Sequence, residues 1–353
     1  MTAPGGVAWG DLQSFCVVAL EAVGAPRGSA ETVAASLIDA DLRGLDSHGV
    51  VARLPGYVAR VHAGGIVPGA EVVTVRGDAG PVALLDGGDG FGQVAGVAAT
   101  QLALELANGN GVGIVAVRGS NHLGALGYYT RMLAAAGAVG HAASGGGPRI
   151  APWGGAEPLL ATNPWSFAFP ATDRPPMVVD VSNGVVLTGQ VDGPAAAGGR
   201  IPLGWALDQS GLPTEDAAAG AAGSLLPFGG AKGAALTLAL EALVSVLTGA
   251  AFSRHVPSLA DPTQPQRLGH LFMALPVESF QSKQEFHDRM EQLLQWVETS
   301  RPVEGGPTVR VPGMRGEATA GERRRSGIPL SGRRIALDQL ADELGIARLS
   351  PSG

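Results

Sequence analysis

Apolar positions recur at helical spacing in several stretches and predict most of the helices. Between residues 11 and 42, Leu12, Phe15, Cys16 and Ala19 keep this spacing, and residues 25–28 break the run into two helices. Ser29 is expected to cap the second of these helices. The same pattern predicts further helices over residues 51–63, 93–107, 124–136, 232–249, 281–299 and 335–344.

Short apolar runs bounded by turn residues predict the strands, over residues 82–86, 112–117, 138–143, 166–169 and 177–181. A stretch rich in Gly, Pro and Ala over 192–200 is expected to be a loop, and the polar stretch 302–325 a mobile loop. Helices come first, then mixed strands and helices, then helices again. This order predicts an α/β or α+β fold.

Composition and charge exclude several classes of protein. Hydrophobic residues make up 45% of the 353 positions and charged residues 16%, which excludes a disordered chain. The net charge of −7 and the lack of a basic run argue against a nucleic-acid partner. No stretch reaches the ~18 consecutive apolar residues of a membrane span, so no membrane partner is expected either.

Cysteine usage and the start of the chain predict a cytoplasmic protein. Cys16 is the single cysteine, so neither an intrachain disulfide nor a zinc site built from cysteines is possible. A lone cysteine fits a reducing compartment. The first ten residues have no basic start and no apolar core, and so do not read as a signal peptide.

One glycine-rich segment matches a dinucleotide-binding pattern only superficially. Residues 90–95 read G-x-G-x-x-A after a predicted strand and before a predicted helix. Asp86 and Asp89 would repel a pyrophosphate there, and no acidic residue ends the next strand, so a Rossmann site is disfavoured. A P-loop is excluded, because residues 229–233 lack the Gly-Lys-Ser/Thr ending.

Two of the seven histidines lie in polar surroundings. His48 follows Asp46 and Ser47 just before a predicted helix, where Asp46 or Ser47 could instead simply cap that helix. His122 follows a predicted buried strand, in a segment that could also be an ordinary turn and helix start. No two histidines are four residues apart, as in a helical metal site, so no metal is expected.

Two other segments resemble backbone cradles for an anion. Residues 152–155 lead to 161–164, and residues 227–233 carry Lys232 into a long apolar helix. The alternative is an ordinary glycine-rich turn beside a solvated lysine. Asp180 ends an apolar run, where it either caps a turn or orients a histidine.

Taken together and in order, these segments resemble the malate/L-lactate dehydrogenase family of NAD(P)-dependent oxidoreductases, which lack a Rossmann fold. The family also includes ureidoglycolate, sulfolactate, diketogulonate and Δ1-piperideine-2-carboxylate enzymes. The resemblance covers about residues 10–346. It rests on residues 43–50, 120–124, 154–155, 162–164, 201–208, 227–233, 247–250 and 327–330.

The resemblance implies a mixed sheet wrapped by N- and C-terminal helices, and a homodimer. Residues 1–75 would pack with C-terminal helices of 265–353, and residues 76–264 would form the α/β domain that binds NAD or NADP. It implies that the cofactor lies near residues 144–146, 180–182 and 232–233. The individual cofactor-binding candidates are Gly146, Asp180, Val181, Ser182, Lys232 and Gly233.

It also implies hydride transfer at C2 of a 2-hydroxy or 2-oxo acid, or alternatively reduction of the C=N bond of a cyclic or 2-imino acid. NADPH is slightly favoured if the enzyme acts as an imine or keto reductase. His48 is assigned as the acid/base, oriented by Ser47 or Asp180, and His122 is the second candidate. The remaining candidates would bind the substrate: Arg53, Tyr57 and Thr162.

Some positions depart from the family pattern. Arg53 and Tyr57 fall five and nine residues after His48, where the family has four and eight, and one residue turns a helix by about 100°. Gln190 stands where the family has a lysine. A non-catalytic relative that binds a nucleotide or a partner protein therefore stays an alternative.

Overall fold

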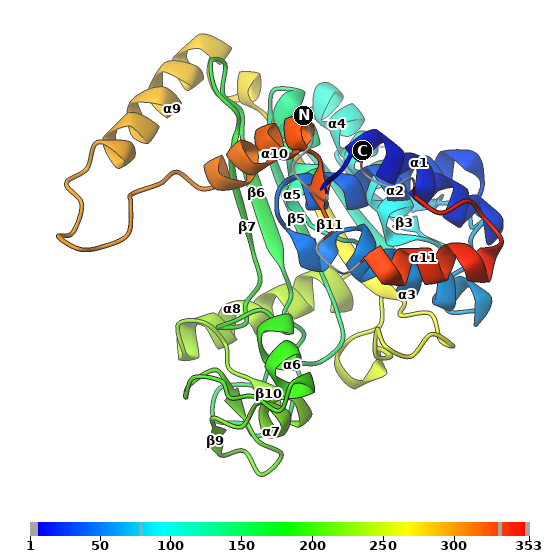
Figure 1. Ribbon diagram of the computed structural model, residues 1–353. Helices are drawn as coiled ribbons and strands as arrows, with labels where there is room; N and C mark the ends of the chain where they lie inside the picture. The colour runs from blue at the N-terminus through cyan, green and yellow to red at the C-terminus, as the bar shows by residue number, and fades with distance from the viewer. Residues whose placement is uncertain (1–5, 78–79, 331–333, 350–353) are drawn as a thin grey trace.

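A seven-stranded mixed sheet forms the centre of the molecule, in a computed structural model that describes residues 6–77, 80–330 and 334–349 (Figure 1). Only the second and third strands of the sheet run parallel, and every other neighbouring pair is antiparallel. In spatial order the strands are β2 (Val73–Arg76), β3 (Val82–Asp86), β4 (Gly113–Ser120), β11 (Leu268–Pro276), β5 (Ala138–Ser144), β6 (Trp165–Phe169) and β7 (Met177–Val181).

Two helices bury one face of this sheet. Helix α4 (Gly92–Asn110) connects the parallel strands, and α5 (Gly127–Ala135) follows β4. Alanines along α4 pack with β4, β11 and Tyr129 of α5 in one apolar cluster. Burying these small residues lets helix and sheet approach closely, and their removal from water stabilises the fold. The predicted mixed α/β class is confirmed.

The N- and C-terminal helices pack side by side in a second apolar core (Figure 1, blue and red). A short antiparallel pair, β1 (Gly6–Val7) and β12 (Ile328–Pro329), joins the two regions. The helices of this second core are α1 (Trp9–Ala22), α2 (Arg27–Leu42), α3 (Val50–His62), α10 (Met314–Ser326) and α11 (Arg334–Leu344). Ion pairs reinforce this contact, with Arg43 bound to both Asp39 and Glu317 at 3.0 and 2.5 Å.

Most of the remaining elements lie at the two ends of strands β6 and β7 (Figure 1). A small lobe contains β8 (Ala206–Leu207), β9 (Pro213–Thr214), β10 (Ser224–Leu225), α6 (Gly189–Ala196) and α7 (Ala217–Ala222). Helix α8 (Ala231–Glu241) continues as a π turn, η2 (Ala242–Val246). The long α9 (Lys283–Glu298) extends beyond the β6–β7 end of the sheet (Figure 1). Short turns complete the fold: η1 (Asp46–His48), η3 (Ser253–His255) and η4 (Val277–Ser279).

Several local expectations were wrong. Helix α6 occupies part of the expected loop 192–200, and α10 occupies much of the expected mobile loop 302–325. Helix α2 begins at Arg27 after Pro26, so Ser29 is not its cap. Proline before a first turn is favourable because its fixed φ suits the entry into a helix. The sequence did not predict β2 and β11.

The proposed division at residues 75 and 265 stays a prediction. Strand β11 belongs to the segment grouped with the terminal helices, yet it lies between β4 and β5 inside the sheet. Within the three described ranges, no helix combines the length and the apolar character needed to cross a bilayer.

Candidate functional site

His48 lies in the turn η1 that joins α2 to α3. Asp41 reaches from α2 to accept a hydrogen bond from the Val50 backbone N–H at 2.8 Å, and so caps α3. A Cβ at Gly49 would lie 1.8 Å from the Asp41 carboxylate, so only glycine allows this approach. Ser47 Oγ lies 3.0 Å from His48 Nδ1, and Asp46 pairs with Arg323 at 2.9 Å.

His122 lies on a rigid support just after β4. The neighbouring Asn121 is buried and donates to the backbone carbonyls of Asp89 and Gly90, both at 2.9 Å. Its side-chain oxygen accepts from the Gln266 backbone N–H at 3.0 Å. Since three separated segments meet at Asn121, the backbone that carries His122 is fixed before any ligand binds.

The fold brings the two histidines together. Their rings stack with centroids 5.7 Å apart and planes inclined by 22°. Tyr57, on α3, places its hydroxyl 2.8 Å from His122 Nδ1, and Gln93, on α4, donates to that hydroxyl at 2.8 Å. Residues from α3, α4, η1 and the end of β4 thus form one connected polar cluster, which we call the histidine cluster: His48, Tyr57, Gln93 and His122.

Arg53 supplies positive charge to the histidine cluster. It lies one helical turn before Tyr57 on α3, so the changed spacing from His48 does not turn it away from the histidines. Its positive charge lowers the pKa of both histidines and of Tyr57. Its Nε atom is buried and has no hydrogen-bond partner among the described residues. Arg53 is half-buried, and a guanidinium with an unpartnered Nε is suited to bind a carboxylate ligand.

Burial and charge keep the histidines neutral. Burial, assisted by Arg53, lowers the pKa of His48 to about 4. Burial and the charges of Arg53 and His48 hold the pKa of His122 well below its ordinary value. Burial likewise raises the pKa of Tyr57 and keeps its hydroxyl protonated. Near neutral pH the histidine cluster therefore contains two neutral imidazoles and a phenol.

A third histidine, His270 of β11, was not identified from the sequence. It is fully buried between β4 and β5, and its Nδ1 lies 2.9 Å from Ser144 Oγ. Burial lowers the pKa of His270 to about 3, and the charge of His270 contributes to the lowered pKa of His122. Strand β11 was not predicted from the sequence, so nothing in the sequence indicated that His270 would contact Ser144.

Acidification should destabilise the fold through His270. Its pKa is lowered in the folded state, so the unfolded chain binds more protons between pH 6.5 and about 3. Stability is therefore lost as the pH falls through that window. Between pH 7.5 and 5.5 we expect His270 to account for a loss of about 1 kcal/mol in the free energy of unfolding. Denaturant titrations of the parent and of His270→Gln should differ in this pH dependence, with exposed His62→Gln as the control. Equal slopes in parent and His270→Gln would contradict the assignment.

The other candidates from the sequence lie outside the histidine cluster. Asp180 is exposed at the end of β7 and accepts from the Gly127 backbone N–H at 2.7 Å, at the start of α5. In the described chain the hydrogen-bond partner of His48 is thus Ser47 and not Asp180. Thr162 is partly buried, and its carbonyl accepts from Asn183 N. Val181 and Ser182 follow Asp180 at the sheet edge.

The strand β5 leads into a run of glycines at residues 145–147 that includes Gly146. Two buried polar atoms beside this segment, Asn163 Oδ1 and His270 Nε2, have no hydrogen-bond partner in the part of the chain that the structure describes. Asn163 precedes Pro164, whose carbonyl accepts from Ser144 N, and His270 contacts Ser144 directly. A carboxamide carries both donors and an acceptor, and so is a group that satisfies such atoms. These residues fit a nicotinamide.

The turn before α8 fits a phosphate. Gly229 and Gly230 adopt positive φ angles of 61° and 62°, and a Cβ at Gly233 would lie 1.7 Å from the Phe228 carbonyl. Only glycine allows this tight turn, which leaves the first N–H groups of α8 open. Lys232 is exposed on that first turn and adds positive charge.

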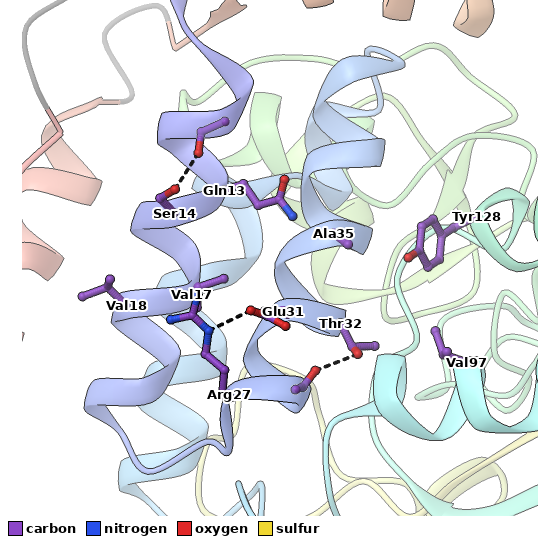
Figure 2. A pocket seen from close by; sticks show the side chains of 12 residues that line it. Gln13, Ser14, Val17, Val18, Arg27, Glu31, Thr32, Ala35, Val97 and Tyr128 are labelled. Carbon is purple, nitrogen blue, oxygen red and sulfur yellow. Dashed lines mark hydrogen bonds and ion pairs between the residues drawn. The ribbon is translucent and has the colours of Figure 1, made fainter.

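A separate cleft of about 550 Å³ lies between α1, α2, α4 and α5, and none of the histidine cluster lines it (Figure 2). Several of its polar side chains are already paired: Ser14 with Gly10, Thr32 with Gly28, and Arg27 with Glu31 and with Glu21 of α1. A ligand pocket normally offers polar groups that converge on open space. None of the described residues that line the cleft is a histidine, and the paired imidazole and phenol groups lie in the histidine cluster, so we place the chemistry there.

Comparison with known proteins defines the family. The model of the malate/L-lactate dehydrogenase family matches residues 7–337. The chain belongs to the malate/L-lactate dehydrogenase family. It is therefore an oxidoreductase, and the resemblance inferred from its motifs is confirmed. The matched residues include the seven-stranded sheet, the small lobe, the histidine cluster and the turn before α8.

This chain is similar to several members of the family over nearly its whole length. A malate dehydrogenase of Pyrococcus abyssi is 38% identical over 351 residues, which cover 96% of this chain and 95% of the relative. A (2R)-3-sulfolactate dehydrogenase (NADP(+)) of Chromohalobacter salexigens is 40% identical over 318 residues, 90% and 92% of the two chains. The structure of a sulfolactate dehydrogenase of Methanocaldococcus jannaschii has a TM-score of 0.89 at 32% identity, covering 97% and 98%.

Proposed function

We propose that this enzyme transfers a hydride between NAD or NADP and C2 of a small 2-hydroxy or 2-oxo acid. The observation that carries the proposal is Arg53, whose buried Nε has no partner among the described residues, beside two neutral histidines in a fold of this family. The malate and sulfolactate dehydrogenases among its relatives have names that fit such substrates. A cytoplasmic location is part of this proposal.

When bound, the nicotinamide supplies or accepts the hydride, and the protein supplies orientation and a proton. Arg53 binds the substrate carboxylate through charge-assisted hydrogen bonds, with Thr162 as a second contact. His122 is the proton donor in the direction of reduction, because Tyr57 holds its Nδ1 at 2.8 Å and leaves the opposite ring nitrogen for the substrate. His48, stacked against His122 and held by Ser47, excludes water and keeps the ring in place.

A panel of substrates tests the proposal. NADH and NADPH oxidation is measured with 2-oxo acids, with cyclic 2-imino acids, and with simple ketones that lack a carboxylate. We expect turnover of at least one 2-oxo acid and none of the ketones, since Arg53 requires a carboxylate. Turnover of imines alone would assign the chain to imine reduction. No turnover in the whole panel would support a non-catalytic relative.

Lys232 is proposed to contact a cofactor phosphate. Lys232→Ala should raise the cofactor KM by about tenfold to 100-fold and change kcat little, since a hydrogen bond to a charged group contributes about 1.5–3 kcal/mol in ground state and transition state alike. Lys283→Ala is the matched control, because Lys283, at the start of α9, is the other lysine of the chain and pairs with Glu278 of η4. An unchanged cofactor KM in Lys232→Ala would remove this residue from the site.

A homodimer is supported by the surface of α8 and η2. Helix α8 is apolar on nearly all sides, yet Leu238 is 59% exposed, and Leu247 just after η2 is 70% exposed. Helices with apolar residues all round are normally covered. We expect the purified protein to be a dimer by light scattering and Leu238→Glu/Leu247→Glu to be a monomer. Val303→Glu, on an exposed loop elsewhere, should stay dimeric, and a monomeric parent would contradict the proposal.

A further inference from the structure

The glycine-rich segment 90–95 has a structural use different from phosphate binding. A Cβ at Gly92 would lie 2.3 Å from the Asn121 carbonyl and 2.4 Å from the His122 carbonyl. Glycine therefore allows the first turn of α4 to press directly against the backbone that carries His122. The next residue, Gln93, is fully buried and its side chain reaches Tyr57.

The hydrogen bond from Gln93 to Tyr57 determines which group donates in the hydrogen bond between Tyr57 and His122. Its amide nitrogen can only donate, so the Tyr57 oxygen accepts at 2.8 Å. The single hydroxyl proton of Tyr57 is then directed to His122 Nδ1, also at 2.8 Å. Nδ1 is therefore the acceptor, and the neutral ring of His122 carries its proton on Nε2.

The opposite orientation of the Gln93 amide is disfavoured. The Oε1 atom of Gln93 is buried and has no partner among the described residues. Reversing the amide would place both N–H donors at that position without a partner, whereas the present orientation uses one N–H for Tyr57 and leaves the other N–H and Oε1 without a hydrogen-bond partner among those residues. Unpaired buried donors cost folding free energy, so the orientation with the nitrogen toward Tyr57 is the more stable one.

We propose that Gln93 is a positioning residue, which acts through Tyr57 to hold His122 as the Nε2-protonated tautomer. The inference rests on the proposed hydride transfer. When the hydride reaches C2, the substrate oxygen takes the Nε2 proton while Nδ1 takes the hydroxyl proton of Tyr57. The phenolate that remains is stabilised by the Gln93 N–H and the charge of Arg53, both of which lower the pKa of Tyr57, and a solvent proton restores the hydroxyl after the product leaves.

Two substitutions separate this role from simple packing. Gln93→Glu offers a carboxylate that accepts the Tyr57 proton, so the Tyr57 oxygen must accept from His122 and the tautomer reverses. Gln93→Met fills the same space and removes the donor. Thr100→Val is the matched control, because Thr100 is fully buried on the same helix and its hydroxyl donates to the Gly96 carbonyl of α4.

Nitrogen NMR of imidazole-labelled protein reads the tautomer, with His122→Asn to assign the signal. We expect an Nε2–H ring in the parent and in Thr100→Val, and an Nδ1–H ring in Gln93→Glu. We also expect kcat to fall by about 10²-fold in Gln93→Glu and less in Gln93→Met, with the substrate KM little changed. The acidic limb of the pH profile should move in both Gln93 variants and stay in place in Thr100→Val.

The outcomes distinguish this inference from the proposed function. An Nδ1–H ring in the parent, or an Nε2–H ring and parental kcat in folded Gln93→Met, would overturn the role of Gln93. If Gln93→Glu does not fold, Gln93→Met decides the question alone. If the tautomers follow the expectation but no 2-oxo acid is turned over, the positioning role stands and the proposed substrate is wrong.

Discussion

Alanine in place of His122 should lower kcat by about 10²–10⁴, the usual loss when a general acid is removed. Cofactor KM should change little, because the proposed phosphate contact lies at the turn before α8. The melting temperature should also change little, since His122 is only partly buried and its hydrogen bond is with Tyr57. Steady-state kinetics measure kcat and the cofactor KM, and thermal unfolding measures the melting temperature, on the same preparations of parent and His122→Ala.

His48→Ala is the matched comparison. His48 contacts Ser47 and stacks on His122, so its loss should reduce kcat by less than the loss of His122. His62→Ala, at an exposed position on α3, should behave as the parent. The sequence favoured His48 as the acid. If His48→Ala is inactive and His122→Ala is active, His48 is the acid, as the sequence indicated, and the assignment of His122 from the geometry is wrong.

Removing Arg53 should produce the second large effect. Arg53→Ala should lower kcat/KM for a 2-oxo acid on the order of 10²–10³-fold, because losing one partner of a buried charge pair costs about 2–5 kcal/mol. Arg53→Lys should recover only part of this loss, since an ammonium cannot bind a carboxylate in two parallel hydrogen bonds. Arg76→Ala, at an exposed position on β2, is the control.

The same variant has a second signature. Arg53 lowers the pKa of both His48 and His122, so its removal should raise both values toward their ordinary range. The acidic limb of the pH–rate profile should then move to higher pH. A lower kcat/KM without this movement would mean that Arg53 binds the substrate from outside the histidine cluster.

The sequence predicted those parts of the fold that depend on local pattern. The apolar run at 112–117 marks β4, and the spacing of apolar residues in 281–299 marks α9, which a capping box at Ser282 and Glu285 starts. Strand β11 was missed because it is buried on both faces between β4 and β5 and shows no clean alternation.

Elements held by distant contacts were not predictable in this way. Helix α10 contains two glycines and three consecutive arginines, and its polar sequence suggested a loop. In the fold Glu317 pairs with Arg43, and Arg323 pairs with Asp46 at 2.9 Å. These partners lie about 270 residues earlier in the chain, so no local window contains them. Tertiary contact overrides the weak propensity.

The site was predictable to the extent that motifs marked it. The segments around His48 and His122 pointed to both histidines, and Arg53 and Tyr57 followed from the family resemblance. Gln93 had no such signal, because a single glutamine within an apolar helix resembles any other polar residue. Its importance comes from burial and from the hydroxyl of Tyr57, which belongs to another helix.

The most direct test follows a labelled hydride. NADH or NADPH carrying deuterium at the transferred position of the nicotinamide is incubated with the enzyme and the best 2-oxo acid of the panel in ordinary water. The product is then examined by mass spectrometry and proton NMR. The account predicts a 2-hydroxy acid with one deuterium at C2, with the hydroxyl proton supplied through His122. A reduced product without deuterium at C2, or no reduction of any 2-oxo acid, would contradict it.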